Sequence, residues 1–585
     1  MMLQALIAYA DREDLGDPDF EAVAVRWLIS LDRDGKLAGE PIPLKGTAGE
    51  KQLRPFTSPN ELNQGTRSHF LCDTLERAVL FPDPKAADKA AARRVQHSYF
   101  RSLLEEAATA TPVEASRLRS VLSFLQDEAA VAEIWEKLTA ARAKPSDNAT
   151  FSVDGNILPA SEPLRQFWRE RRRRFSASGS ARELKICVAT GELAETLDTT
   201  EKIRGVPGGL AMGTNLISFD KDAFCSFGLE QAQNAALSVR AELKIRASLN
   251  SLIEKSRGQG LVFNDTIHLH WMRHVEEHDP FDLLAKADPE AIEALIQSVK
   301  KGDPYIGPDP NAYYAMSLSG NGARIVVRDW LESTVPEIKR NIAGWFTDLA
   351  IVHPDGSGIK RDFKFGALLY GMVRSEPAEL SPQLPTQLLH AALRGRHVPL
   401  PQTALAAALR RQQLDQENKL NPARLALIKA CLLRPPPRSQ TQTPIETMTE
   451  SLNPESRDRA YLCGRLFAVF AELQGAALQN VNAGVVERYY ASASVTPALV
   501  MGRLFRNAQF HIAKAEGEGG WKKGKAINAG RDFEVITRAI GEEFPPTLTL
   551  EEQGRFALGY YHQKADYRRR GAERKEEQSV AAANG

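Results

Sequence analysis

Hydrophobic positions along the chain follow two periods. Runs such as 22–32 (AVAVRWLISLD) alternate apolar and polar residues, which is typical of strands with one buried face. Runs such as 114–138 (EASRLRSVLSFLQDEAAVAEIWEKL) repeat apolar residues at three- and four-residue spacing, which is typical of amphipathic helices. We therefore expect a helix at 3–12, a strand at 22–32, a polar loop rich in turn-forming residues at 51–73 and helices across 86–138. A β-rich region should follow from 151, with helices inserted at 231–255 and 289–300.

Residues 311–330 (NAYYAMSLSGNGARIVVRDW) predict a β-hairpin. Two alternating runs flank Gly320, Asn321 and Gly322, residues that tolerate the positive φ angles of a tight turn. Arg324 and Arg328 lie on the return strand. They form either an ordinary solvated face or a basic ribbon against nucleic acid.

Beyond the proline-containing boundary at 374–385 (RSEPAELSPQLP), nearly every segment predicts a helix. The tract 434–444 (RPPPRSQTQTP) is typical of a linker. Amphipathic segments at 457–473, 496–514, 526–540 and 550–567 predict a four-helix bundle, followed by a frayed tail. The fold class is thus α+β, with a mixed N-terminal region and an all-α C-terminus. The expected domains are 1–150, 151–375, 376–447 and 448–585.

Composition narrows the class of protein. A chain of 585 residues with 43% hydrophobic and 25% charged residues is typical of a multidomain globular protein, and no run approaches the length of a membrane span. The N-terminus lacks the basic start of a signal peptide, so we expect a cytoplasmic protein without membrane contact. A net charge of +1 means that any polyanion must bind to local patches. The five cysteines form no C-x-x-C pair, which predicts buried thiols: Cys72, Cys187, Cys225, Cys431 and Cys463.

Two motifs suggest catalytic chemistry that the residues do not support. The stretch 519–526 (GGWKKGKA) fits a P-loop spacing, but alanine replaces the Ser or Thr that binds magnesium. It predicts a basic loop between helices, either solvated or contacting single-stranded nucleic acid through Trp521. The stretch 268–278 (HLHWMRHVEEH) lacks the H-E-x-x-H order. It suggests a metal site less strongly than an imidazole-rich helical face or a strand end; its histidines are His268, His270, His274 and His278.

Two further stretches are basic or glycine-rich. Residues 204–215 (RGVPGGLAMGTN) carry no nucleotide fingerprint, although free backbone amides in such a loop can meet phosphates. Residues 165–175 (RQFWRERRRRF) form either a solvated helix face or a phosphate contact. No set of acids suggests a metal nuclease, and no Ser, His and Asp arrangement stands out. The sequence therefore favours binding surfaces over a catalytic centre, and no cofactor or metal is expected.

Ten stretches in order resemble the large subunit of the type I-C CRISPR surveillance complex (type I-C Cascade). They are MLQAL (2–6), FLCD (70–73), CVATGE (187–192), IRGVPGG (203–209), LISFDKDAFCSFG (216–228), YYAMSLSGNGARIVVRDW (313–330), NPARLALIKACL (421–432), RAYLCGRLFAVFAELQ (459–474), RYYASASVTPALV (488–500) and LGYYHQ (558–563). The chain departs from the family pattern at 64–69, which is QGTRSH where the family carries Arg-Thr-Ser-Gly, and at Asp220, where Asn is expected.

The resemblance implies an RNA-guided antiviral complex in which this subunit does no chemistry. It would read the short motif flanking the target in double-stranded DNA, help to unwind the duplex, hold the displaced strand and support recruitment of a helicase-nuclease. Its partners would be the guide RNA with backbone and guide-end-capping subunits, and small subunits translated internally from Met448. The alternatives are a catalytic nuclease or ATPase, and a purely structural helical scaffold.

Under this hypothesis the basic and amide side chains divide into three groups. Amides and a guanidinium would read base edges, cations would hold phosphates, and a tryptophan with three lysines would contact the displaced strand. The hairpin would present its arginines to the duplex or the guide, and its apolar face would close the N-terminal core. The motif-reading candidates are Asn60, Asn63, Gln64 and Arg67; the phosphate-binding candidates are Lys51, Arg54, Lys202, Arg204, Arg324 and Arg328; the displaced-strand candidates are Trp521, Lys522, Lys523 and Lys525.

Overall fold

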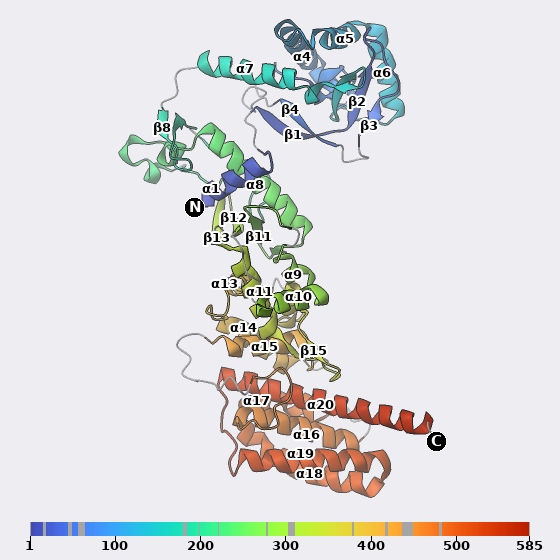
Figure 1. The fold of residues 1–585 in the computed structure, drawn as a ribbon, viewed down its shortest axis with the longest axis vertical. Coiled ribbons are helices and arrows are strands. Elements are labelled where there is room, and N and C mark those ends of the chain that lie inside the picture. Colours follow the sequence, from blue (N-terminus) through green and yellow to red (C-terminus); the bar gives the residue numbers. More distant parts are fainter. Residues whose placement is uncertain are drawn as a thin grey trace. The chain divides into compact units, whose positions relative to one another are not determined.

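The chain folds into two compact units, and each is described here by itself (Figure 1). The first unit comprises residues 1–201 and 217–249, and the second comprises residues 202–216 and 250–585. The structure is a computed structural model that describes residues 2–15, 19–44, 50–55, 65–178, 184–197, 199–219, 221–276, 279–301, 311–376, 379–415, 419–435, 448–478 and 483–583. No helix within those ranges has the length and apolar character needed to cross a membrane.

A small mixed sheet covered by helices forms the core of the first unit. Strand β2 (Trp27–Leu31) lies parallel to β6 (Asn148–Val153). The segment between the two strands includes three long helices: α4 (Ala90–Ala110), α5 (Ala115–Gln126) and α6 (Glu128–Ala140). Asp127 begins α6 by accepting hydrogen bonds from the amides of Ala129 and Ala130, which would otherwise lack partners. The aromatic rings of Phe100, Phe124 and Phe151 pack where the helices meet the sheet.

The remaining elements of the first unit are short strands and helices around this core. Strands β3 and β5 pair antiparallel with β2 and β6, while β1 and β4 form a separate antiparallel ribbon. The elements are α1 (Met2–Arg12), β1 (Phe20–Val25), β3 (Ile42–Pro43), β4 (Glu50–Pro55), β5 (Cys72–Thr74), α3 (Leu75–Ala78), η2 (Pro84–Lys89), β7 (Asn156–Ile157), η3 (Leu158–Ala160), α7 (Glu162–Ser178), β8 (Leu184–Ile186), β9 (Leu193–Glu195), η4 (Asp222–Phe224), η5 (Ser226–Gly228), η6 (Gln231–Ala235) and α8 (Val239–Gly258), the last of which continues into the second unit.

An antiparallel sheet in the order β10, β11, β12, β13 opens the second unit. Its strands are β10 (Val262–Phe263), β11 (Thr266–Met272), β12 (Ala312–Asn321) and β13 (Arg324–Thr334). The central strand β12 is buried on both faces, because consecutive residues from Tyr313 to Ser319 are all buried. Alternation in the sequence predicted the hairpin correctly but not the second covering layer.

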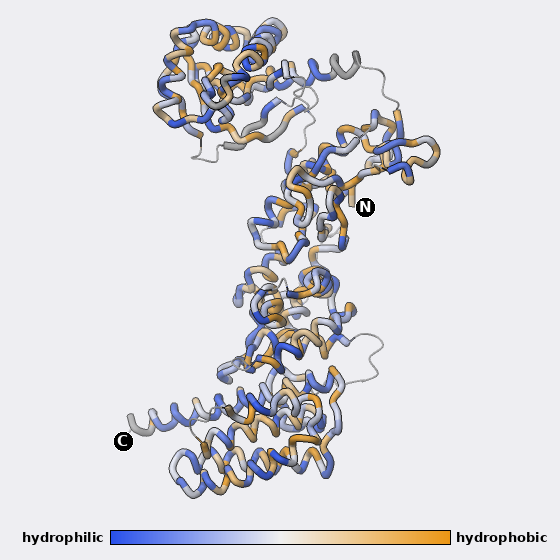
Figure 2. Tube along the Cα trace, turned by 180° about the vertical axis from the view of Figure 1, so that it is seen from behind, coloured by the Kyte–Doolittle hydropathy of each residue, from blue (hydrophilic) through white to orange (hydrophobic). Residues whose placement is uncertain are grey.

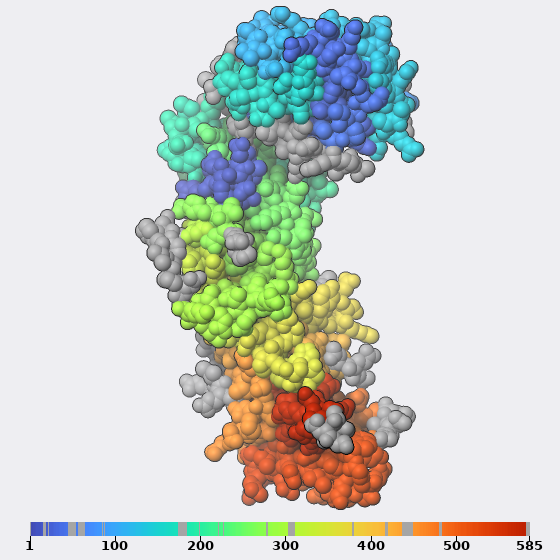
Figure 3. Space-filling view, turned by 45° about the vertical axis from the view of Figure 1, so that its right-hand side comes forward, coloured from blue at the N-terminus to red at the C-terminus, as the bar shows by residue number. Residues whose placement is uncertain are grey.

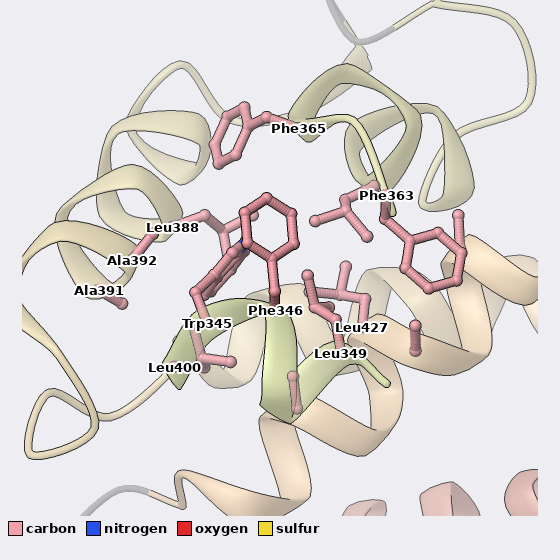
Figure 4. Close-up of a cluster of buried hydrophobic side chains, with 14 of the residues drawn as sticks. Trp345, Phe346, Leu349, Phe363, Phe365, Leu388, Ala391, Ala392, Leu400 and Leu427 are labelled. Atoms are coloured by element: carbon pink, nitrogen blue, oxygen red, sulfur yellow. The ribbon is translucent and has the colours of Figure 1, made fainter. Parts of the chain in front are cut away.

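Helices of the second unit pack on this sheet around Trp345 and Phe346, which are fully buried (Figure 4). Leu388 and Leu427, from two different helices, point towards the same centre. The elements here are α9 (Asp282–Lys286), α10 (Pro289–Lys301), α11 (Val335–Leu349), β14 (Ile351–Val352), β15 (Ile359–Lys360), α12 (Phe365–Gly371), α13 (Gln383–Arg394), α14 (Gln402–Leu414) and α15 (Pro422–Leu433).

The C-terminal bundle has its own core, formed by aromatic residues such as Phe467, Tyr490, Phe556 and Tyr560. Its helices are α16 (Arg459–Ala477), α17 (Val485–Val495), α18 (Pro497–Glu518), α19 (Gly520–Ile540) and α20 (Leu550–Ala583). They pack into one continuous body, orange to red in Figure 3. Helix α16 lies at the centre, and most of its residues are buried on all sides.

Five expectations about the fold are wrong in detail. The bundle contains α17 in addition to the four predicted helices. The tail does not fray within the described residues, because α20 continues to Ala583 as an exposed, mostly hydrophilic helix (Figure 2). Residues 50–55 form a strand, not a loop. The apolar face of the hairpin packs against α11 in the second unit and not in the N-terminal core, and Cys225 is exposed.

Arg434 also differs from its predicted place in a linker. It ends α15, is 3% exposed, and donates to Asp348 at 2.7 Å while its guanidinium lies over the Trp345 ring. A buried arginine is tolerated only when a carboxylate and hydrogen-bond acceptors replace its hydration. The rest of the predicted linker, from residue 436 to 444, lies outside the described residues.

Two glycines allow α16 and α20 to cross closely, which generates a test of the bundle. A Cβ at Gly464 would lie 1.9 Å from the Phe556 carbonyl oxygen, and one at Gly559 would lie 2.1 Å from the Tyr461 oxygen. Gly464→Ala should therefore force the helices apart and lower the free energy of unfolding of the bundle by about 1–3 kcal/mol.

Gly475→Ala on the same helix is the matched control, since Gly475 is exposed and nothing would meet its Cβ within 4 Å. Alanine is the better helix former, so this variant should gain up to about 1 kcal/mol. Urea denaturation followed by circular dichroism measures both. Equal stability of the two variants would contradict the close crossing.

Candidate nucleic-acid interface

Residues 202–216, here called the strap, lie across the turn of the β12–β13 hairpin. The strap closes on itself where Ile203 and Thr214 exchange backbone hydrogen bonds of 2.8 Å. It is fastened to the hairpin because Gly320 donates its amide to the Pro207 oxygen at 2.7 Å, and Asn215 exchanges 2.9 Å bonds with the backbone of Ala323 and Ile325. The glycine-rich motif and the hairpin, far apart in sequence, thus form one backbone unit.

Glycines, which have no side chain, make the contact between strap and hairpin possible. A Cβ at Gly320 would lie 2.2 Å from the Gly209 nitrogen, a distance that no real Cβ contact reaches. Gly208 has φ +72° and its Cβ would lie 3.1 Å from the Gly320 oxygen. Gly322, with φ +59°, supplies the left-handed residue of the turn. The glycines therefore explain both motifs. The turn needs Gly322, the approach of strap and hairpin needs Gly320, and the folding of the strap on itself needs Gly209, whose Cβ would lie 2.6 Å from Thr214 Cγ2.

Four of the predicted phosphate-binding residues lie on the strap and the hairpin. Lys202 and Arg204 are exposed on the strap, Arg328 is exposed on β13, and Arg324 is half-buried at the turn. Among the described residues, Lys202, Arg204 and Arg328 form no ion pair, so their charges are not neutralised by carboxylates of the chain. Such charges bind phosphate oxygens without reading sequence.

A β-bulge determines where Arg328 points. Ser317 pairs with Asp329 and Leu318 pairs with Val327, so Arg328 is the extra residue between the two pairs. Its Nε donates to the Ser319 hydroxyl at 2.7 Å, which holds the guanidinium beside the end of the sheet. Bulges commonly re-aim a side chain in this way. The simple alternation of Arg324 and Arg328 along one face, which the sequence suggests, is therefore broken at the second arginine.

The backbone amides of the strap are less available than its side chains. Gly209 donates to the Val206 oxygen at 3.2 Å, and Gly213 donates to the Leu210 oxygen at 2.9 Å. Arg257, which the sequence analysis did not single out, donates to the Gly205 oxygen at 3.1 Å through Nε. A ligand at this surface would accordingly meet cationic side chains more than free amides.

The structure describes only part of the predicted motif-reading loop. Asn60, Asn63 and Gln64 lie outside the described residues, as does the side chain of Lys51, whose backbone belongs to β4. Arg54 is half-buried on the same strand, and the Arg67 guanidinium lies 5.9 Å from the centre of the Tyr99 ring.

A buried histidine of the first unit lies near Arg54 and Arg77. His69 is 5% exposed, and burial, reinforced by the charges of Arg54 and Arg77, lowers its pKa to about 3. The histidine is therefore neutral at pH 7 and adds no charge to Arg54 and Arg67 in the first unit.

Internal acids pair with three arginines of the predicted basic stretch on α7. Arg169 pairs with Glu162 at 2.8 Å, Arg171 with Glu106 at 2.8 Å and Arg172 with Asp19 at 3.4 Å. These pairs oppose a phosphate contact by those three arginines, since each of their guanidinium groups already has a carboxylate.

The displaced-strand candidates lie in the first turns of α19 and not in a loop. Lys522 pairs with Glu518, and Lys525 pairs with Glu472 at 2.9 Å. Trp521 remains 62% exposed, and Lys523 is exposed without an ion pair among the described residues. The structure thus leaves one aromatic ring and one cation of this group open to a ligand.

The histidine run forms a buried strand, so the predicted helical face is wrong and the strand alternative holds. His268 contacts the Ser317 hydroxyl at 2.8 Å, and His270 Nε2 lies 3.0 Å from an Asp279 oxygen. Three potential metal-ligand atoms lie within 4.8 Å of one another, one each from His270, Asp279 and Asp282. The sequence did not connect these residues. Gln259 and Lys286 already bind Asp282, at 3.1 and 2.7 Å, which is typical of a structural cluster. His274 is exposed beyond the strand, and His278 lies outside the described residues.

The sequence matches the model of a known protein family. The family model described as CRISPR-associated protein (Cas_Csd1) matches residues 6–568, which include the strap, the hairpin and the bundle. No curated protein matches the chain. Because the family model covers nearly the whole chain, the protein belongs to the Cas_Csd1 family of CRISPR-associated proteins, the large subunits of the type I-C surveillance complex.

Proposed function

We propose that this subunit binds target DNA for the guide-loaded complex, recognises the protospacer-adjacent motif and helps to unwind the duplex. The observation that carries the proposal is the strap fastened to the hairpin, which presents Lys202, Arg204 and Arg328 without internal carboxylate partners among the described residues. Because the backbone is already fixed at several points, binding to phosphates orders only the cationic side chains and not the backbone that carries them. The subunit itself performs no chemistry in this proposal and works in the cytoplasm.

Base reading is assigned to the first unit in the same proposal. Asn60, Asn63 and Gln64 supply amides that match adenine, and Arg67 supplies a guanidinium for guanine or a narrow minor groove. Lys51 and Arg54 hold the adjacent phosphates on β4. The family assignment supports this division of labour, and the loop residues remain a prediction.

The C-terminal bundle is assigned to the displaced strand and to small subunits. Trp521 and Lys523 offer a stacking surface and a cation to single-stranded DNA, whereas Lys522 and Lys525 must first leave Glu518 and Glu472. Met448 precedes α16 and marks our proposed internal translation start. The core within the bundle supports a small subunit that folds from these helices. Tyr461 on α16, Tyr561 on α20 and Met448 itself, which is 6% exposed, are buried in the core shared with the preceding helices, so an internally started subunit would expose that face. A helicase-nuclease would be recruited after unwinding.

The direct test is the affinity of the assembled, guide-loaded complex for target duplex at one salt concentration. The duplex carries either an intact or a scrambled flanking motif, and the complex is prepared with and without this subunit. We expect discrimination between the two flanks only when the subunit is present. Equal discrimination without it would assign motif reading to another subunit and leave this chain as a scaffold.

Replacing the hairpin arginines tests the phosphate contact. Arg328→Ala and Arg324→Ala should each weaken duplex binding equally for every flanking sequence, and each should reduce the slope of log affinity against log salt by about one. Arg340→Ala is the control, since Arg340 is an exposed arginine of α11 and belongs to neither hairpin strand. An unchanged salt slope together with a lower melting temperature would show that the hairpin arginines are structural.

A further inference from the structure

A polar groove lies between the hairpin and helix α13, with a volume of about 490 Å³. Helix α13 contributes Gln383, Thr386, Gln387 and His390, and the hairpin contributes Ser319, Gly320 and Arg328. Gly320 is the same residue that contacts Gly209 of the strap. The groove therefore begins where the strap is fastened, beside the exposed Arg328.

The two faces of α13 differ in chemistry. Leu384, Leu388, Ala391 and Ala392 are buried in the core of the second unit, and Figure 4 shows Leu388 directed towards Trp345. The polar residues recur at three- and four-residue spacing on the other side of the helix, which places them along one face. They are Gln383, Thr386, Gln387 and His390.

The side chains of this face have unused hydrogen-bonding capacity. Gln383 and Gln387 are exposed and form no hydrogen bond among the described residues. A carboxamide offers donors and an acceptor together, the pattern that matches the edge of a nucleic-acid base.

A cation neutralises one of the two carboxylates that line the groove. Asp329 is bound by Arg394 at 2.9 Å and lies 3.5 Å from His390 Nδ1. Asp265 is exposed at the rim and is the other carboxylate of the lining. Arg328 faces the groove with its guanidinium held only by the neutral Ser319 hydroxyl among the described residues.

We propose that this groove holds one unstacked nucleotide, with Arg328 on its phosphate and the amides of Gln383 and Gln387 on the edge of its base. The inference rests on the proposed function, because the strap and hairpin must first hold the nucleic-acid backbone. Small-molecule pockets span roughly 300–1,000 Å³, so the groove accommodates one nucleotide but no duplex. His390, half-buried at the far end of the face, offers a ring for stacking.

The double variant Gln383→Ala/Gln387→Ala tests the groove in the full chain within the guide-loaded complex. We expect target affinity to fall on the order of tenfold, with an unchanged salt slope, because amides neutralise no phosphate. Arg328→Ala changes that slope, so the two residue types are distinguishable. The double variant Gln297→Ala/Gln402→Ala removes two exposed glutamines from other helices of the same unit and should bind as the wild type does.

The near-isosteric double variant Gln383→Glu/Gln387→Glu controls for a loss of binding that is caused by misfolding. Carboxylates keep the side-chain shape but repel phosphate and lose the amide donors, so this variant should bind still more weakly at an unchanged melting temperature. Wild-type affinity in both the alanine and the glutamate variants of Gln383 and Gln387 would overturn the proposed nucleotide site. Unchanged affinity and salt slope in Arg324→Ala and Arg328→Ala would instead overturn the proposed function.

Fluorescence of 2-aminopurine identifies which strand supplies the nucleotide. The probe is placed in turn in the guide RNA, the target strand and the displaced strand. One position should brighten in the wild-type complex and remain quenched in Gln383→Ala/Gln387→Ala. If no position brightens in a Gln-dependent way, no unstacked nucleotide occupies the groove and the inference fails.

Discussion

Backbone crowding between Gly320 and Gly209 is the constraint on which the proposed nucleic-acid face depends. A side chain at Gly320 would overlap the backbone of Gly208 and Gly209, so only glycine at position 320 lets the strap reach the hairpin turn. Once they meet, backbone bonds from Gly320 and Asn215 fix the strap without using any side chain. The cations of both segments are left for a ligand, which explains why two unrelated motifs in the sequence serve one surface.

Charge placement, more than charge count, distinguishes this surface from the other basic stretches. The chain carries 75 basic and 74 acidic residues, and several of its arginine- and lysine-rich stretches are matched by nearby acids. Arg171 on α7 and Lys525 on α19 both have carboxylate partners within 3 Å. Since a paired cation must lose its partner before binding phosphate, we expect Lys202 and Arg328 to bind phosphate more strongly than the paired cations of α7 and α19.

Local periodicity predicted the secondary structure well but could not predict which segments meet. The hairpin followed from alternation around Gly322, and the bundle helices followed from three- and four-residue spacing. The histidine run was ambiguous, because the four-residue spacing of His270, His274 and His278 fits a strand as well as a helix. Trp521 was placed in a loop because of the flanking glycines, although α19 already begins at Gly520. The sequence located the cations of the candidate site, but the strap contact, the bulge at Arg328 and the neighbouring glutamines depend on tertiary packing.

Site-specific photocrosslinking tests most directly whether the β12–β13 hairpin contacts nucleic acid. A benzophenone amino acid replaces Val326, which lies on β13 between Arg324 and Arg328, in the guide-loaded complex bound to labelled target duplex. We expect label transfer from nucleic acid to this position, and none to a probe that replaces the exposed Glu290 on α10. Crosslinks from position 326 only to protein, or no more than from position 290, would contradict the assignment of the hairpin as a nucleic-acid contact.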